Sequence, residues 1–118
     1  MEELKFYYIR DKYSHNKPVI TVCLLKNNDG IISRGISVCS HLDNPSKKTG
    51  RGISLSRARK ANGTKSNHDK PLVEFSPGLF SKFRRILMTN RMSPNEIDYL
   101  YSYDANLGEF EKRLMDVG

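Results

Sequence analysis

Glycines and basic residues alternate in one short stretch, Lys47-Lys48-Thr49-Gly50-Arg51-Gly52, directly before a helical pattern. Glycines let a backbone approach an anion closely, and the first N–H groups of a helix are unpaired donors. Arg51 and Arg57 can add bidentate hydrogen bonds to phosphate oxygens. We therefore predict an anion site here, with a glycine-containing helix start bearing solvated lysines as an equal alternative. It is not a P-loop, because the GxxxxGK(S/T) pattern is absent.

A second candidate site lies further along, in Phe80-Ser81-Lys82-Phe83-Arg84-Arg85 followed by Asn90-Arg91. Aromatic rings and guanidinium planes stack on nucleobases, and an Asn amide can pair with the donor and acceptor edge of a base. The alternative is that both phenylalanines belong to the core, which we favour for Phe83. Phe80 falls in the first turn of an expected helix, where a side chain can reach the rim of a pocket.

No residue pattern indicates catalysis or metal binding. His15, His41 and His68 fall in expected turns or loops, without a Ser, Cys or acid at triad spacing. The acids Asp98, Asp104, Glu109 and Glu111 are expected on helix surfaces. Cys23 and Cys39 lie in strand-like runs, outside any CxxC pair, and are expected to be buried thiols. We predict no enzyme, no catalytic residue, no metal site and no cofactor.

Length and charge set the class of protein. The 118 residues suit one domain, and the formal net charge of +7 is unevenly distributed. Residues 47–70 hold eight basic residues and one acid, whereas residues 92–118 hold two basic residues and six acids. Such clustering suggests an anionic partner. No apolar run reaches the roughly 20 residues of a membrane span, and no signal peptide is evident, so we expect a cytoplasmic protein without membrane contact.

Three strands are expected at residues 4–13, 19–26 and 31–40, with the turn Asn27-Asn28-Asp29-Gly30 between the last two. Both faces of the second strand are apolar, which predicts a central strand covered on both sides. The third strand has a face of small residues, Ser33, Gly35, Ser37 and Cys39, against which another element can pack closely. The simplest arrangement is an antiparallel meander.

Helical patterns follow the strands. Residues 53–61 carry the small-residue stripe Ser54, Ala58 and Ala61, suited to close packing on a sheet or another subunit, and Asn62-Gly63 is expected to end this helix. Further helices are expected from Pro77, from Pro94 and over residues 108–116. Tyr99, Tyr101 and Tyr103 cannot share one helix face, so at least one should be exposed. We predict a single α+β domain over residues 1–118. An antiparallel β-meander of three or more strands (residues 1–40) precedes three to four helices (residues 51–118), which pack on one side of it.

Several of these residues resemble a known family. Gly35-Ile36-Ser37-Val38-Cys39-Ser40, Asp43-Asn44-Pro45-Ser46 and Gly50-Arg51-Gly52-Ile53-Ser54-Leu55-Ser56-Arg57-Ala58 are similar to the small phage proteins of the first anti-Thoeris family. Phe80 and Asn90, ten residues apart, also resemble the base-binding pair of that family. The likeness covers residues 31–91.

The resemblance implies a sponge, which binds the cyclic ADP-ribose isomers made by TIR-domain defence enzymes and holds them uncleaved in the cytoplasm of an infected bacterium. It also implies dimers that can assemble into hexamers, with pockets at the dimer interface. Phe80 would stack on the adenine and Asn90 would hydrogen-bond it. Arg34, Arg85 and Arg91 are candidates for the pyrophosphate, chosen by charge. A separate site for cyclic oligonucleotides would use Arg57 and Lys26.

Two other hypotheses remain open from the residues alone. The basic block could neutralise several phosphates, which would suit a small nucleic-acid-binding protein of a mobile element. An exposed tyrosine could instead anchor a protein-binding inhibitor.

Overall fold

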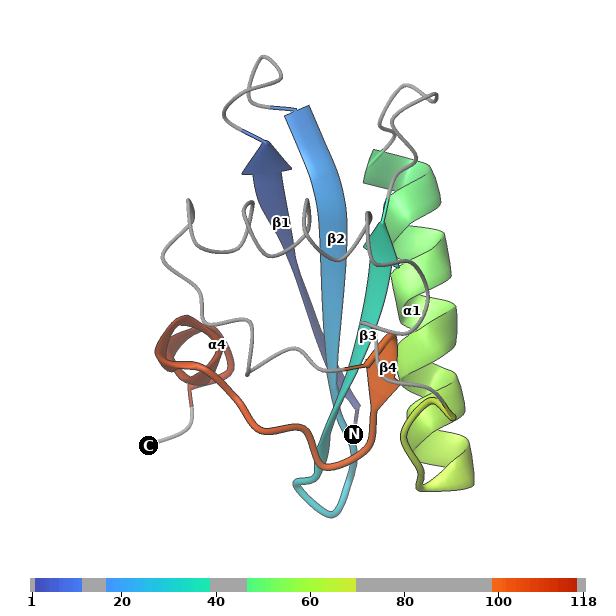
Figure 1. The fold of residues 1–118 in the computed structure, drawn as a ribbon. Helices are drawn as coiled ribbons and strands as arrows, with labels where there is room; N and C mark the ends of the chain where they lie inside the picture. Colours follow the sequence, from blue (N-terminus) through green and yellow to red (C-terminus); the bar gives the residue numbers. More distant parts are fainter. Residues whose placement is uncertain (1, 12–16, 39–46, 70–98, 117–118) are drawn as a thin grey trace.

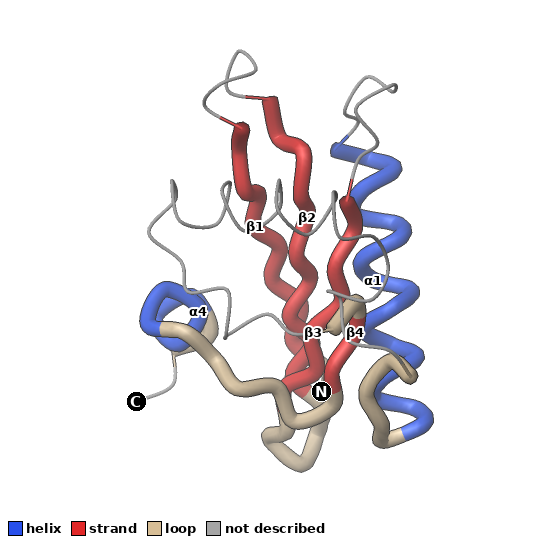
Figure 2. The backbone as a smooth tube through the Cα atoms, in the orientation of Figure 1, coloured by secondary structure: helices blue, strands red, loops and turns tan. Residues whose placement is uncertain are grey.

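A computed structural model describes residues 2–11, 17–38, 47–69 and 99–116. Its strands are β1 (Glu3–Asp11), β2 (Lys17–Lys26), β3 (Ile32–Val38) and β4 (Tyr101–Ser102), and its helices are α1 (Lys47–Thr64) and α4 (Glu109–Leu114). The strands form one antiparallel sheet in the order β1-β2-β3-β4, as the ribbon and the tube show (Figures 1 and 2). The α+β class and the antiparallel meander are therefore confirmed. The helices expected from Pro77 and Pro94 lie outside the described residues.

Strand β2 is central and covered on both sides, as its sequence predicts. Its residues from Ile20 to Leu25 are all buried. Because side chains alternate along a strand, two apolar clusters form on opposite faces of the sheet. One cluster includes Ile20, Val22 and Leu24 with Ile9, Ile36 and Met115. The other includes Cys23 and Leu25 with Ala58 of α1.

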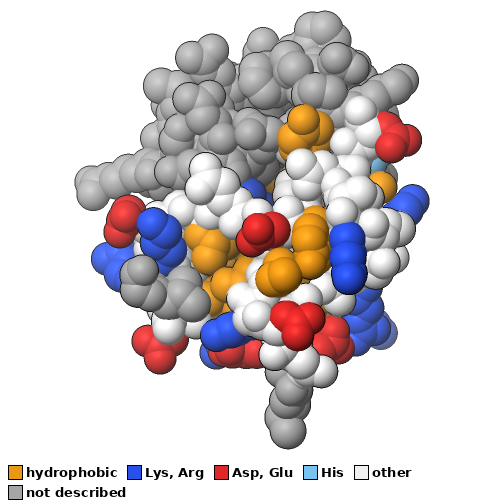
Figure 3. Space-filling view, turned by 90° about the horizontal axis from the view of Figure 1, so that it is seen from below, with side chains coloured by type: hydrophobic (Ala, Val, Ile, Leu, Met, Phe, Trp, Pro, Cys, Tyr) orange, Lys and Arg blue, Asp and Glu red, His pale blue; other side chains and the backbone are white. Residues whose placement is uncertain are grey.

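The Asn27–Gly30 turn forms the expected hairpin between β2 and β3. The Asn27 carboxamide oxygen accepts hydrogen bonds from the backbone N–H groups of Asp29 (2.9 Å) and Ile31 (3.0 Å). Gly30 takes a φ of +83°, which glycine adopts without steric cost. These local bonds set the register that pairs Lys26 with Ile32. This end of the molecule shows hydrophobic side chains between charged ones (Figure 3).

Helix α1 packs very closely on the sheet, on the small-residue face of β3. A Cβ atom added to Gly35 would collide with the carbonyl oxygen of Ser54 and the backbone nitrogen of Ala58. Gly50 leaves room for the Thr21 side chain of β2. The stripe Ser54, Ala58 and Ala61 is buried, which confirms that small residues face the sheet.

The expected start of this helix is wrong. Helix α1 begins at Lys47 and ends at Thr64, so Gly50 and Gly52 lie within it and not in a preceding loop. Burial against the sheet outweighs the low helix propensity of glycine, which is about 1 kcal/mol per residue. The two glycines therefore do not form an anion-cradling loop.

The C-terminal part of the chain differs most from expectation. Residues Tyr101 and Ser102 form β4, which pairs with Gly35 and Arg34 of β3. Tyr101 is buried, whereas Tyr99 and Tyr103 are half-buried, so none of the three is fully exposed. Helix α4 forms as expected, but its neighbour Met115 packs in the cluster opposite α1. The described helices thus cover both faces of the sheet, not one (Figure 1).

Neither of the described helices combines the length and the apolar character that crossing a membrane would require.

Replacing Gly35 with alanine should destabilise the protein by about 1–3 kcal/mol, because the new methyl group would meet helix backbone that cannot move aside cheaply. Urea unfolding would measure the change. Gly52→Ala is the matched control: nothing lies within 4 Å of its added Cβ, and we expect a gain of roughly 0.5–1 kcal/mol from helix propensity. A Gly35→Ala protein as stable as its parent would contradict this packing.

Burial raises the pKa of the Cys23 thiol from 9.0 to about 12, with a smaller opposing effect of Arg59. In a Cys39→Ser background we expect no alkylation of Cys23 at pH 8 until the protein unfolds. The folded state holds this proton more tightly than the unfolded chain does. Its contribution to stability is therefore complete below pH 9 and is lost as the pH rises from 9 towards 12. Comparison with Cys23→Ala in urea unfolding at each pH isolates this loss, and identical pH profiles would refute it.

Candidate functional site: the basic helix α1

Basic side chains project from helix α1 on every side that the sheet does not cover. Between Lys47 and Lys65 the chain holds seven basic residues and no acid. The exposed ones are Lys47, Lys48, Arg51, Arg59, Lys60 and Lys65. Because the buried small residues pack this helix against the sheet, these basic residues all project away from that contact. Such an arrangement attracts anions.

Two basic residues near the start of α1 contact Tyr8 of β1, a residue that was not predicted from the sequence. The Arg51 guanidinium donates a hydrogen bond from Nη1 to the Tyr8 hydroxyl oxygen at 2.9 Å. The Lys47 ammonium lies 5.0 Å from the centre of the Tyr8 ring, in cation–π geometry. Tyr8 and Phe6 alternate along β1, and this alternation was the available signal that Tyr8 would face the same side as α1. The hydrogen bond to Tyr8 thus orients the Arg51 side chain towards β1.

Arg57 lies on another side of the helix. Its Nη1 donates to the carbonyl oxygen of Ile36 on β3 at 2.6 Å. The side chain is half-buried, and burial lowers its pKa from the ordinary arginine value. No acidic side chain of the described residues pairs with it. A neutral partner compensates only part of the free energy that a half-buried cation loses when it leaves water. An anion beside the Arg57 guanidinium would form charge-assisted hydrogen bonds with it.

The predicted site residues are not all brought together. Arg51 and Arg57 are six residues apart, which is about 120° around a helix, and they contact opposite flanking strands. Lys26 is half-buried at the end of β2, where strand alternation places it with Leu24, on the face opposite α1. Phe80, Arg85, Asn90 and Arg91 lie outside the described residues.

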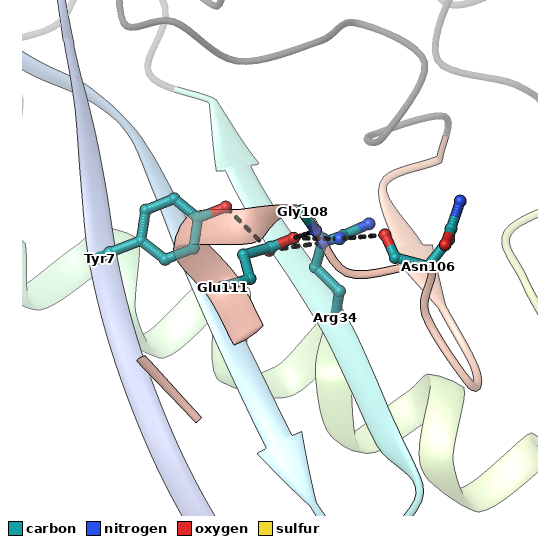
Figure 4. A network of polar contacts seen from close by, with 5 residues as sticks. All are labelled: Tyr7, Arg34, Asn106, Gly108 and Glu111. Atoms are coloured by element: carbon teal, nitrogen blue, oxygen red, sulfur yellow. Dashed lines mark hydrogen bonds and ion pairs between the residues drawn. The ribbon is translucent and has the colours of Figure 1, made fainter. Parts of the chain in front are cut away.

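Arg34 is buried in the molecule and bound to Glu111. Its exposed fraction is 2%, and that of Glu111 is 0%. Arg34 donates from Nε to Glu111 Oε2 at 2.9 Å, and its Nη2 forms a short ion pair with Glu111 Oε1. The Nη2 group also donates to the carbonyl oxygen of Asn106 at 2.9 Å (Figure 4). This geometry ties the guanidinium to the C-terminal segment.

The Glu111 carboxylate has no accepting capacity to spare. It also receives hydrogen bonds from the Tyr7 hydroxyl at 2.8 Å and from the Gly108 backbone N–H at 3.1 Å (Figure 4). A carboxylate offers about four lone-pair sites, and these donors occupy all of them. The network therefore has a structural role: it joins β1, β3 and the segment around α4.

The expectation of a surface position for Glu111 is wrong. Glu109 is exposed on α4, as expected, whereas Asp104 is exposed between β4 and α4 and not on a helix, and Asp98 lies outside the described residues. Glu111 points into the molecule because Arg34 offers a buried opposite charge. The available signal was the three-residue spacing from Gly108 to Glu111, which is that of a side chain returning to the start of its own helix.

Within the described ranges, no three His, Cys, Asp or Glu side chains gather closely enough to hold a metal ion. Cys23 is a free, buried thiol there, and Cys39 lies outside those ranges. His68 is half-buried, with its ring 5.2 Å from that of Tyr101 in an edge-to-face contact.

Comparison of the chain with known protein families, with curated proteins and with solved structures found no match.

The variant Glu111→Gln should lose about 3–5 kcal/mol of folding stability, because it removes the negative charge that compensates the buried Arg34 guanidinium. Thermal and urea unfolding would measure this loss. Glu109→Gln on the exposed side of α4 is the matched control and should stay within about 0.5 kcal/mol of the parent. We expect the double variant Arg34→Met/Glu111→Leu to lose less than the two single changes combined. Additive losses would show that the pair is not coupled.

Proposed function

We propose that this protein is a phage anti-defence protein that binds and sequesters cyclic ADP-ribose-type signalling nucleotides without cleaving them. It thereby blocks TIR-based immunity in the cytoplasm of the infected cell. The protein acts as a homo-oligomer of dimers, which can form hexamers, with its signal pockets between subunits. Each of these properties follows the resemblance to the first anti-Thoeris family.

The observation that supports the proposal best is the state of Arg57. A half-buried guanidinium with only a carbonyl oxygen as its described partner favours an anionic ligand. Arg57 also matches the family position for cyclic oligonucleotides, so the proposal includes a second site of that kind. Lys26 would serve such a site only from another subunit, because in one chain it lies on the other face of the sheet.

A second observation supports the proposal from the fold. The two resembling segments that the structure describes are residues 35–38 and 50–58, and they are in direct contact. Gly35 lies against Ser54 and Ala58, and Arg57 donates to Ile36. The resemblance therefore falls on one packed unit of the protein and not on scattered positions.

Sequestration requires tight binding, because a sponge works by stoichiometry. A Kd near ~10 nM corresponds to roughly −11 kcal/mol. Stacking of adenine on Phe80, an amide hydrogen bond from Asn90 and arginine contacts to the pyrophosphate would supply it in a pocket poor in water. Arg85 and Arg91 are the arginines proposed for this role. Arg34 could take part only by leaving Glu111.

Calorimetry with cyclic ADP-ribose and its linkage isomers tests the proposal. We expect binding of at least one isomer and recovery of the intact ligand after the complex is heated. Phe80→Ala and Asn90→Ala should each weaken binding at least tenfold, whereas Phe110→Ala, which removes an exposed aromatic ring of α4, should not. Arg57→Ala should abolish the binding of cyclic oligonucleotides, with Arg113→Ala as its control. Absence of binding, or conversion of the ligand, would refute the proposal.

A further inference from the structure

One side of α1 forms a narrow, exposed ridge that no contact described above uses. We define the outward ridge as Lys48, Gly52, Ser56, Arg59 and Gly63, all of which are exposed. At 100° per residue these five positions fall within about 80° of one another around the helix. A methyl group added to Gly52 or Gly63 would meet no atom within 4 Å. The ridge is therefore open, with cations separated by residues of minimal size.

The charges of the ridge are not balanced by the part of the chain that the structure describes. Neither Lys48 nor Arg59 forms an ion pair with an acidic side chain there, and α1 itself contains no acid. Lys60, next to Arg59, lies 5.6 Å from the centre of the Tyr101 ring. Exposed cations of this density create a positive potential that favours a polyanion.

We infer that the outward ridge of α1 docks across the major groove of duplex DNA, with its cations on the phosphates of the two strands. Lys48 and Arg59 are eleven residues apart, which is about 16 Å along a helix. The major groove of B-form DNA is about 12 Å wide. Cations near the two ends of the ridge can therefore reach both rims, while Gly52 and Ser56 pass over the open groove between them.

The composition of the ridge determines the mode of binding. Gly52 and Ser56 are too short to contact several base edges, so the contacts are made to phosphates and binding is independent of sequence. With about three phosphate contacts, from Lys48, Arg59 and Lys60, the slope of log K against log salt concentration is about −2.7. The A-form major groove of duplex RNA is too narrow for this docking.

DNA binding by the outward ridge is independent of nucleotide sequestration. It uses Lys48, Arg59 and Lys60, whereas the proposed signal pocket uses Phe80 and Asn90. A protein that fails to hold cyclic ADP-ribose can still bind DNA through the ridge, and the reverse is equally possible. Titration of both ligands against the same variants separates the two outcomes.

Fluorescence anisotropy with labelled, mixed-sequence duplex DNA tests the inference. From about 50 to about 200 mM salt, we expect affinity to fall roughly fortyfold. Lys48→Glu/Arg59→Glu should reduce the salt slope by about 2 and weaken binding at low salt at least tenfold. The matched control Lys5→Glu/Arg113→Glu makes the same change of charge on exposed residues outside α1 and should retain most of the affinity.

Four outcomes would overturn the inference: no binding at low salt, equal loss in the two double variants, equal affinity for duplex RNA, or equal competition by polyglutamate. Equal loss would mean that net charge alone attracts DNA. Circular dichroism of each variant establishes that it is folded before its affinity is compared. Unchanged cyclic ADP-ribose binding by the Lys48→Glu/Arg59→Glu variant would show that the ridge is separate from the signal pocket.

Discussion

The close contact between α1 and the sheet is the constraint on which the arrangement of the charged side chains depends. Gly35 on β3 has no side chain, so the backbones of β3 and α1 meet almost directly, and Gly50 on α1 lies against the Thr21 side chain of β2. Because of this contact, the small-residue stripe of α1 faces the sheet and the basic residues of α1 lie outside that stripe. Arg51 and Arg57 then reach in different directions because they flank this buried stripe, one towards β1 and the other towards β3.

A second constraint acts on the opposite face of the sheet. Arg34 and Glu111 carry opposite charges into the interior, where each would be very unfavourable alone. Their pairing holds the chain around α4 against β3, and Tyr7 extends the network to β1. One face of the sheet is thus closed by close backbone packing and the other by apolar side chains around a buried ion pair.

Local patterns predicted much of this fold. The Asn27–Gly30 turn, the two apolar faces of β2 and the small face of β3 depend on neighbours in sequence, and all three are confirmed. Strand β4 could not be predicted in this way, because two residues carry no periodic pattern. Glu111 was assigned to the surface because an acid is usually solvated, and only a distant arginine reverses that preference. For the candidate site, Arg51 and Arg57 were found by charge, whereas Tyr8 became part of it through strand pairing.

By itself, the sequence determined the strand pattern of the meander, the excess of cations in α1 and the small residues that pack inward. These properties are local, since they depend on residue type and spacing along the chain. Only the tertiary structure decided that Gly50 and Gly52 belong to a helix, that Arg34 is neutralised inside the molecule and that Arg57 lies half-buried with no acid among the described residues beside it. Burial and charge pairing join residues far apart in sequence, and their free energies exceed the local preferences from which the sequence is interpreted.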